Sequence, residues 1–150
     1  MDFRFRLGVA LVATAAFAGL ARGDDVRAGT IVVSDAWSRP TAAGMPMGVA
    51  YFVVRNDGAT DDAIVSASTP AAARVEIHQT TFSDGMARMR PLQEITAPAH
   101  GKVAVSPGGI HLMLVDLVKP LAAGTRVPLV LQFRHAGRVE IQLAVGTRAE

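Results

Sequence analysis

The sequence predicts an all-β fold, either an antiparallel β-sandwich or a small Greek-key barrel, built from about eight or nine short strands. Three observations support this prediction. Short runs rich in Val, Ile, Thr and aromatic residues recur along the chain, and clusters of Gly, Pro, Asn and Asp separate them. No segment shows the periodicity of an amphipathic helix. The length of 150 residues fits a single domain.

The expected strands follow one another with short connections. In order, they span residues 28–33, 49–55, 62–69, 74–79, 86–90, 102–106, 111–117, 127–135 and 138–145. Residues 35–48 are expected to form a loop, because this stretch is rich in Pro, Gly and other small residues. Turn signals at residues 56–58, 83–85 and 136–137 predict tight reversals of the chain.

The first 23 residues resemble a secretory signal peptide. Arg4 and Arg6 precede an apolar run over residues 7–21, and small residues at Ala21 and Gly23 suit cleavage after Gly23. This run is shorter than the roughly 20 apolar residues that a membrane span needs, although an uncleaved anchor is the alternative. We therefore expect residues 1–23 to be removed, residues 24–150 to form the folded domain, and the protein to be exported.

Composition narrows the possible functions. The expected leader contains three arginines and one aspartate, so the remaining domain has equal numbers of basic and acidic residues. Without a cluster of Lys or Arg, nucleic acid is a poor candidate partner. The chain contains no cysteine. An exported metal protein of this composition must therefore find soft ligands other than thiolates.

Two histidines and several methionines are candidate metal ligands. His111 and Met113 lie two residues apart in an expected strand and therefore point to the same face. His78 lies in another expected strand, and the turn at residues 83–85 brings the following strand, which contains Met86 and Met89, back against it. Imidazole and thioether ligands together favour Cu(I) over Zn²⁺, whereas a blue-copper site would need a cysteine.

Each of these residues also has an ordinary structural explanation. A lone histidine in a strand is usually a surface or hydrogen-bonded residue, and Met113 could simply fill the core between Leu and Val neighbours. Alternation along the strand leaves open whether Met86 or Met89 is the ligand, and Met89 could face the core. The remaining candidates are expected to be solvated turn residues, namely His100 and His135, or loop and rim residues with possible outer contacts to the site, namely Met45 and Met47.

The sequence lacks the motifs of common enzymes. It has no Gly-x-Ser-x-Gly nucleophile elbow, no His-Glu-x-x-His and no phosphate-binding loop. Glu76 and Glu140 are scattered strand carboxylates that we expect on solvated faces. We therefore expect that the protein is not an enzyme.

The spacing of the candidate ligands resembles the signature of the periplasmic copper chaperones called PCu(A)C, which is His, ten residues, Met, twenty-one residues, then His-x-Met. In this chain ten residues separate His78 from Met89, and twenty-one more lead to His111-Leu112-Met113. Flanking residues agree as well, including the Pro-Gly-Gly at residues 107–109 and the Asn-Asp-Gly at residues 56–58. The similarity covers nearly the whole chain after the expected leader.

This resemblance implies a cupredoxin-like antiparallel Greek-key β-sandwich that binds one Cu(I) through His78, Met89, His111 and Met113. It also selects Met89 over Met86. The family is associated with delivery of copper to the Cu(A) centre of cytochrome c oxidase, in subunit II, alongside Sco-type proteins. A copper buffer or storage protein without a dedicated partner is the alternative. Some members carry a His- and Met-rich extension for Cu(II), but residues 146–150 contain neither residue type, so such a site is not expected there.

Overall fold

The computed structural model describes residues 25–147, and the expected leader at residues 1–23 lies outside this range. The described part of the chain contains strands and connections but no helix, and thus no helix that could cross a membrane. The strands are β1 (Val26–Ala28), β2 (Ile31–Ser38), β3 (Met47–Asn56), β4 (Asp62–Ser68), β5 (Ala72–Ser83), β6 (Met86–Pro91), β7 (Ile95–Ala97), β8 (Gly101–Val105), β9 (Ile110–Leu117), β10 (Arg126–Phe133) and β11 (Gly137–Val145).

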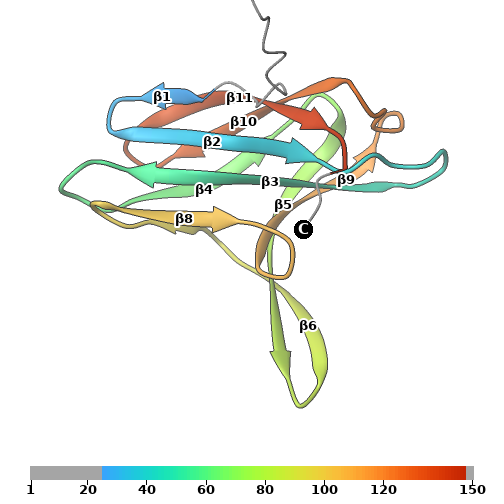
Figure 1. The fold of residues 1–150 in the computed structure, drawn as a ribbon, viewed down its shortest axis with the longest axis horizontal. Coiled ribbons are helices and arrows are strands. Elements are labelled where there is room, and N and C mark those ends of the chain that lie inside the picture. The colour runs from blue at the N-terminus through green and yellow to red at the C-terminus, as the bar shows by residue number, and fades with distance from the viewer. Residues whose placement is uncertain (1–24, 148–150) are drawn as a thin grey trace, which may run out of the picture.

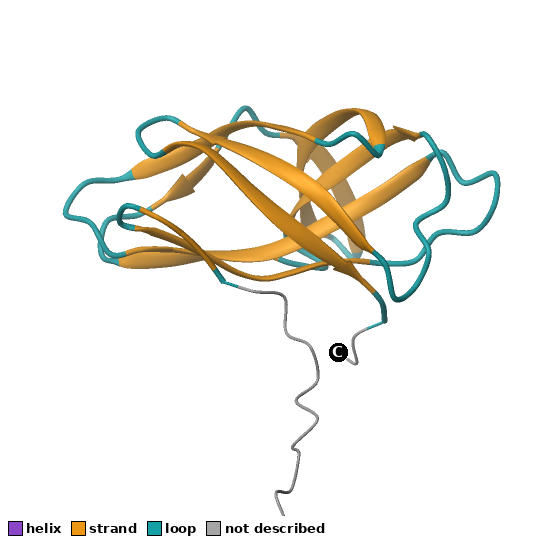
Figure 2. Ribbon diagram, turned by 90° about the horizontal axis from the view of Figure 1, so that it is seen from above, coloured by secondary structure: helices purple, strands orange, loops and turns teal. Residues whose placement is uncertain are grey.

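These strands form one continuous hydrogen-bonded path that folds over a common core (Figures 1 and 2). The order along the path is β6-β5-β9-β3-β2-β11-β10-β4-β7, and β1 and β8 pair with β2 and β3. All pairs are antiparallel except β2 with β11, which run parallel. The predicted all-β class is therefore confirmed, with one parallel pair that the sequence pattern did not indicate.

The number of strands and the first loop differ from the expectation. Residues 25–147 form eleven strands instead of the expected eight or nine, because the three-residue strands β1 and β7 are too short for a periodic pattern. The expected bounds of the loop at residues 35–48 are wrong at both ends. β2 continues to Ser38 and β3 starts at Met47, so the connection spans only residues 39–46. Hydrogen bonding to neighbouring strands overrides the low β-propensity of this stretch.

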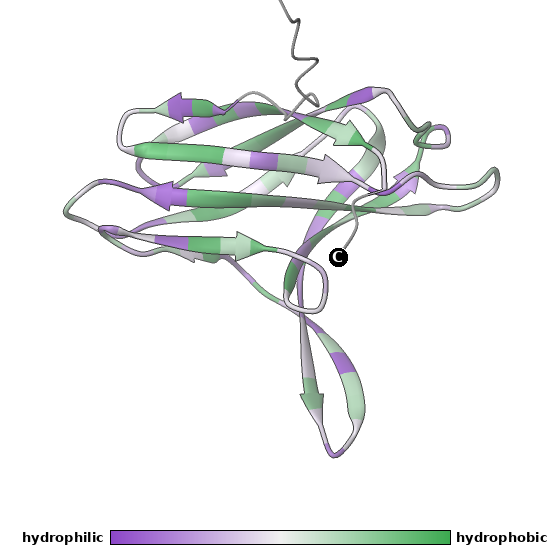
Figure 3. Ribbon diagram, viewed as in Figure 1, coloured by the Kyte–Doolittle hydropathy of each residue, from purple (hydrophilic) through white to green (hydrophobic). Residues whose placement is uncertain are grey.

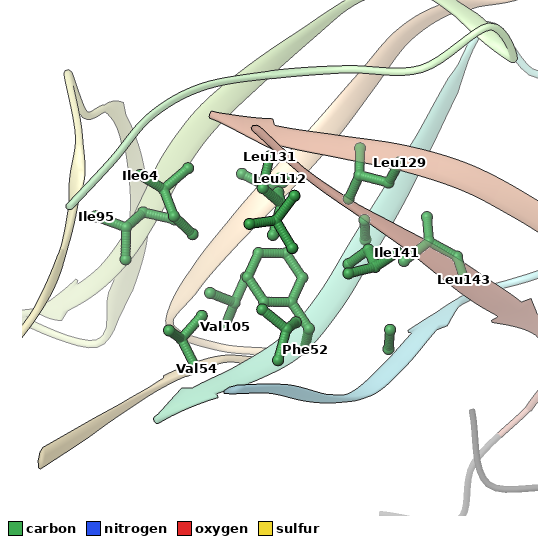
Figure 4. Packing of buried hydrophobic residues seen from close by; sticks show 14 of the residues in the cluster. Phe52, Val54, Ile64, Ile95, Val105, Leu112, Leu129, Leu131, Ile141 and Leu143 are labelled. Atoms are coloured by element: carbon green, nitrogen blue, oxygen red, sulfur yellow. The ribbon is translucent and has the colours of Figure 1, made fainter. Parts of the chain in front are cut away.

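The core lies between the layers and is formed by alternate residues of most strands. Phe52 of β3 is 1% exposed and lies at its centre, close to Val105, Leu112, Leu131 and Ile141 (Figure 4). Burial of a side chain of this size stabilises the fold by about 1.5–3 kcal/mol. Leu112 and Leu114 anchor β9 in this core, so the residues of β9 that alternate with them must face the opposite side of the sheet.

The β5–β6 hairpin extends beyond the core (Figures 1 and 3). Ser83 pairs with Met86, which leaves Asp84 and Gly85 as a two-residue turn with φ values of 53° and 73°. Positive φ at both positions is typical of the type I′ turn that suits the twist of a hairpin. Every residue of β6 is exposed. This hairpin thus presents its side chains to solvent.

Candidate metal site

His78 and His111 lie directly opposite each other on neighbouring strands. His78 of β5 pairs with His111 of β9 in the antiparallel register, and their ring centroids are 6.0 Å apart with a tilt of 55° between the rings. Their side chains share one face, since cross-strand partners project to the same side of a sheet. His111 is 5% exposed, and the side chain of His78 is 19% exposed.

One hydrogen bond on each imidazole defines which ring nitrogen carries the proton. Nδ1 of His111 lies 3.0 Å from the carbonyl oxygen of Gly109, which can only accept, so His111 donates from Nδ1. Nε2 of His78 lies 2.9 Å from Oε2 of Glu76, and an ionised carboxylate also only accepts. The neutral rings therefore present their lone pairs on opposite atoms, Nε2 of His111 and Nδ1 of His78.

Both lone-pair nitrogens are buried and have no hydrogen-bond partner. Among residues 25–147, Nδ1 of His78 and Nε2 of His111 are the buried side-chain nitrogen or oxygen atoms in this state. An unsatisfied buried polar atom typically costs about 1–3 kcal/mol, so folded proteins rarely retain one without a reason. A fixed tautomer with its free nitrogen directed at one locus is the usual arrangement of metal-binding histidines.

The loop before β9 holds His111 in this orientation. Gly108 has a φ of 79°, and the amide of Gly109 donates to the carbonyl of Ser106. The carbonyl of Gly109 accepts hydrogen bonds both from the amide of Thr80 and from His111. The carbonyl group of Gly109, at the end of the Pro-Gly-Gly turn, therefore links β5 to the start of β9 and also sets the tautomer of His111.

Met113 lies on the same face as the histidines. It follows His111 by two residues on β9 and pairs with Glu76 of β5 on one side and Val49 of β3 on the other. Its side chain is partly exposed, whereas Leu112 and Leu114 are fully buried. The expectation that His111 and Met113 point to the same face is thus confirmed, and Leu112 and Leu114 occupy the opposite, core-facing side of β9.

The register of the hairpin separates Met89 from Met86. Met89 pairs with Thr80, which lies two residues from His78 on β5, so Met89 shares the face of the two histidines. Met86 pairs with Ser83 and faces the opposite side. Met89 is 64% exposed, which shows that the alternative of a core-facing Met89 is wrong. The side chain of Met89 is exposed because the β5–β6 hairpin extends beyond the core.

Glu76 has a closer relation to the site than the sequence indicated. We expected a carboxylate on a solvated face, and the side chain of Glu76 is 39% exposed. It also accepts a hydrogen bond from both Arg74 and His78, which we did not predict from the sequence. The hydrogen bond from Arg74, followed by that from His78, lowers the pKa of Glu76. Arg74 also pairs with Asp116 of β9. The i, i+2 spacing of Glu76 and His78 in one strand could have revealed this contact.

The other histidines and methionines singled out in the sequence lie at turns or in a pocket next to Met113. His100 and His135 are exposed turn residues, as expected. Met45 and Met47 line a pocket together with Met113 and Tyr51. Within the part of the chain that the structure describes, no three side chains of His, Cys, Asp or Glu form a group that could hold a metal ion. His78, His111 and Glu76 therefore do not form such a group, and the further candidate donors on the face of the histidine pair are the thioethers of Met113 and Met89.

Comparison with known sequences finds one matching family and a similar protein. Residues 31–145 match the sequence model of the family described as "Putative lipoprotein LpqE-like". A protein of Leifsonia xyli subsp. xyli (strain CTCB07), named "Putative lipoprotein Lxx21020", is 33% identical over 116 residues, which cover 77% of this chain and 69% of that protein.

Comparison with solved structures finds several proteins of similar fold. The copper-bound PCuAC domain from PmoF2 superposes with a TM-score of 0.72 at 25% identity, over 83% of this chain and 99% of that domain. The apo PCuAC domain from PmoF1 has the same TM-score and identity, over 83% and 100% of the two chains. The Cu(I) form of DR1885 from Deinococcus radiodurans has a TM-score of 0.62 at 28% identity, over 77% of each chain. The predicted likeness to PCu(A)C proteins and their cupredoxin-like β fold is thus confirmed.

Proposed function

Since this chain belongs to the LpqE-like family and has the fold of PCuAC domains, we propose that it is a copper-binding, chaperone-like protein. Two of the similar structures, the PmoF2 domain and DR1885, are copper-bound forms. The proposed cargo is one Cu(I) ion, and the proposed ligands are His78, Met89, His111 and Met113. Copper is then cargo to be transferred, and no catalytic step is assigned to the protein.

The observation that carries this proposal is the pair of buried, unpartnered imidazole nitrogens. Nδ1 of His78 and Nε2 of His111 belong to facing residues, and each ring is held by a hydrogen bond through its other nitrogen. A cation between them would accept both lone pairs and would remove the cost of leaving the two nitrogens unpaired. A purely structural histidine pair would gain nothing from this arrangement.

The chemistry of the neighbouring donors supports Cu(I) as the cargo. Met113 and Met89 share the face of the histidines, and the chain contains no cysteine. Thioether sulfur is a soft, neutral ligand that suits Cu(I) and binds hard cations weakly. Two imidazoles and two thioethers therefore favour Cu(I) over Zn²⁺, Mg²⁺ or Ca²⁺.

The unequal exposure of the donors supports transfer rather than permanent storage. His111 is almost fully buried, whereas Met89 lies on the exposed β5–β6 hairpin with 64% of its surface accessible. An incoming ligand of an acceptor protein could displace Met89 first, while the buried histidine still holds the ion. Stepwise ligand exchange of this kind would avoid release of free copper.

The proposed place of action is the periplasm. The names of the family and of the Leifsonia relative refer to lipoproteins, which are exported, and residues 1–23 have the pattern of a signal peptide. The proposed acceptor is the Cu(A) centre in subunit II of cytochrome c oxidase, with Sco-type proteins as further partners. A copper buffer without a dedicated acceptor is the competing proposal.

Deletion of the gene distinguishes delivery from buffering. For a chaperone, we expect cytochrome c oxidase activity to fall in the deletion strain at limiting copper and to recover with the wild-type gene or with excess copper. The His78→Ala, His111→Ala double variant should not restore activity. Unchanged oxidase activity together with increased copper sensitivity would instead identify a buffer.

A further inference from the structure

Beside the histidine pair, a surface pocket gathers three of the six methionines of the chain. Met45, Met47 and Met113 line a cavity of about 240 Å³, together with Tyr51 and Val49. Among the residues that the structure describes, no carboxylate or histidine lines this pocket. Its donors are therefore mainly neutral thioethers, which bind soft monovalent cations and discriminate against hard ones.

Strand register explains why these methionines meet. Met47 of β3 pairs with Val115 of β9, and Val49 pairs with Met113, so Met47 and Met113 are diagonal neighbours on one face. Diagonal neighbours in a sheet have Cα atoms about 7–8 Å apart, within reach of long side chains. Gly48, between Met47 and Val49, faces the core, where a Cβ atom would lie 3.0 Å from Leu121. This tight packing holds the strand segment that carries Met47.

The loop that carries Met45 is fixed at both ends. The amide of Thr41 donates to the carbonyl of Leu121, and the amide of Leu121 donates to the hydroxyl of Thr41. The carbonyl of Pro46 accepts from the amide of Leu117 at the end of β9. The position of Met45 relative to β9 is thus set by backbone hydrogen bonds, although its side chain is 52% exposed and that of Met47 is 38% exposed.

We propose that Met45, Met47 and Met113 form a second binding position for a soft monovalent cation, Cu(I) or its analogue Ag(I), from which the ion passes to the histidine pair. This inference rests on the proposed function, because Met113 belongs to both ligand sets. A cation held by Met45, Met47 and Met113 reaches the histidines by exchanging the first two thioethers for Nε2 of His111 and Nδ1 of His78. Met113 stays bound throughout, and the oxidation state of the ion does not change.

The pocket should bind the ion more weakly than the histidine site does. Methionine side chains have three rotatable bonds each and lose conformational entropy when a cation fixes them. Arg39 also lines the pocket with its guanidinium 6.0 Å from the centre of the Tyr51 ring, and this charge opposes a divalent cation more than a monovalent one. Weak, selective binding suits a position where the ion is received rather than kept.

Silver titration followed by NMR of the methionine methyl groups tests this inference. Ag(I) is redox-inert, and each Met Cε methyl resonance reports on its own sulfur. In the His78→Ala, His111→Ala double variant, we expect one Ag(I) to bind at least tenfold more weakly than in the wild type and to shift the methyl signals of Met45, Met47 and Met113. The signal of Met86, which lies outside the pocket, should stay in place.

Matched substitutions complete the test. Adding Met45→Leu and Met47→Leu to the double variant should abolish the remaining Ag(I) binding, whereas adding Met86→Leu should not. Met45 and Met47 signals that do not move at saturating Ag(I) would overturn the second position. If instead the double variant bound Ag(I) as tightly as the wild type and the Met45 and Met47 signals moved, the histidine site of the proposed function would fail while the methionine pocket would be supported.

Discussion

His78 and His111 face each other across β5 and β9 with their hydrogen bonds on opposite ring nitrogens. His78 donates from Nε2 to Glu76, and His111 donates from Nδ1 to the carbonyl of Gly109. The other ring nitrogen of each histidine is buried and has no hydrogen-bond partner. This pairing organises the site before any ligand arrives, because neither ring can turn without losing its hydrogen bond.

The two histidines should be opposite tautomers in the metal-free protein. At neutral pH, long-range ¹⁵N–¹H NMR spectra should show protonated Nε2 in His78 and protonated Nδ1 in His111. The Gly109 carbonyl and the Glu76 carboxylate impose these states. Finding His111 protonated on Nε2 would place its lone pair on Nδ1, against the Gly109 carbonyl oxygen, and would contradict the geometry of the site.

Met89 and Met86 should differ in their effect on copper affinity. Met89→Leu removes a thioether from the face of the histidines, and we expect it to weaken Cu(I) binding by at least about tenfold, which corresponds to about 1.4 kcal/mol. Met86→Leu is the matched control on the opposite face of the same hairpin. Competition with a coloured Cu(I) chelator under anaerobic conditions measures both constants. Equal affinities for the two variants would remove Met89 from the ligand set.

Glu76 should act as a positioning residue for His78. Loss of a hydrogen-bond partner of a metal-binding histidine typically costs about 10–100-fold in metal affinity. We expect Glu76→Ala to show a loss in this range, and Glu76→Gln to show a smaller one because its amide oxygen can still accept from Nε2 of His78. Glu140→Gln, on an exposed position of β11, serves as the control. Full affinity in Glu76→Ala would show that the hydrogen bond does not matter for binding.

Asp62 should make the stability of the fold sensitive to acid. Burial by itself would raise the pKa of this carboxyl group, but hydrogen bonds from the amides of His135, Ala136 and Ala63 outweigh it and lower the pKa. A carboxyl group whose pKa is lower in the folded state stabilises the protein above its unfolded value of about 3.9, and this contribution is lost as the pH falls through the folded pKa.

The Asp62→Asn variant tests this linkage by urea unfolding over a range of pH. It should lower the free energy of unfolding by about 1–3 kcal/mol at pH 7. The difference from the wild type should shrink below about pH 4, where the aspartate of the unfolded chain becomes protonated. Glu140→Gln, at an exposed position of β11, serves as the control for a carboxyl-to-amide substitution. A difference that grows on acidification would reverse the sign expected for Asp62.

The fold was predictable from local patterns, whereas the details of the site depended on long-range pairing. Alternation identified β3, β5 and β9 and the separate faces of Leu112 and Met113. It could not show that the β5–β6 hairpin extends beyond the core, so the exposure of Met89 had to come from the structure. The sequence also could not predict that one ring nitrogen of His78 and one of His111 are buried without a hydrogen-bond partner, because this depends on the register between β5 and β9.

The proposed function depends on joint binding of one Cu(I) by His78 and His111. Anaerobic titration of the metal-free protein with Cu(I) against a coloured chelator tests it most directly, with the His78→Ala, His111→Ala double variant beside the wild type. Thermal unfolding first shows that both proteins are folded. We predict tight one-to-one binding in the wild type and a loss of at least a hundredfold in affinity in the variant. Equal affinities in the two proteins would contradict the claim.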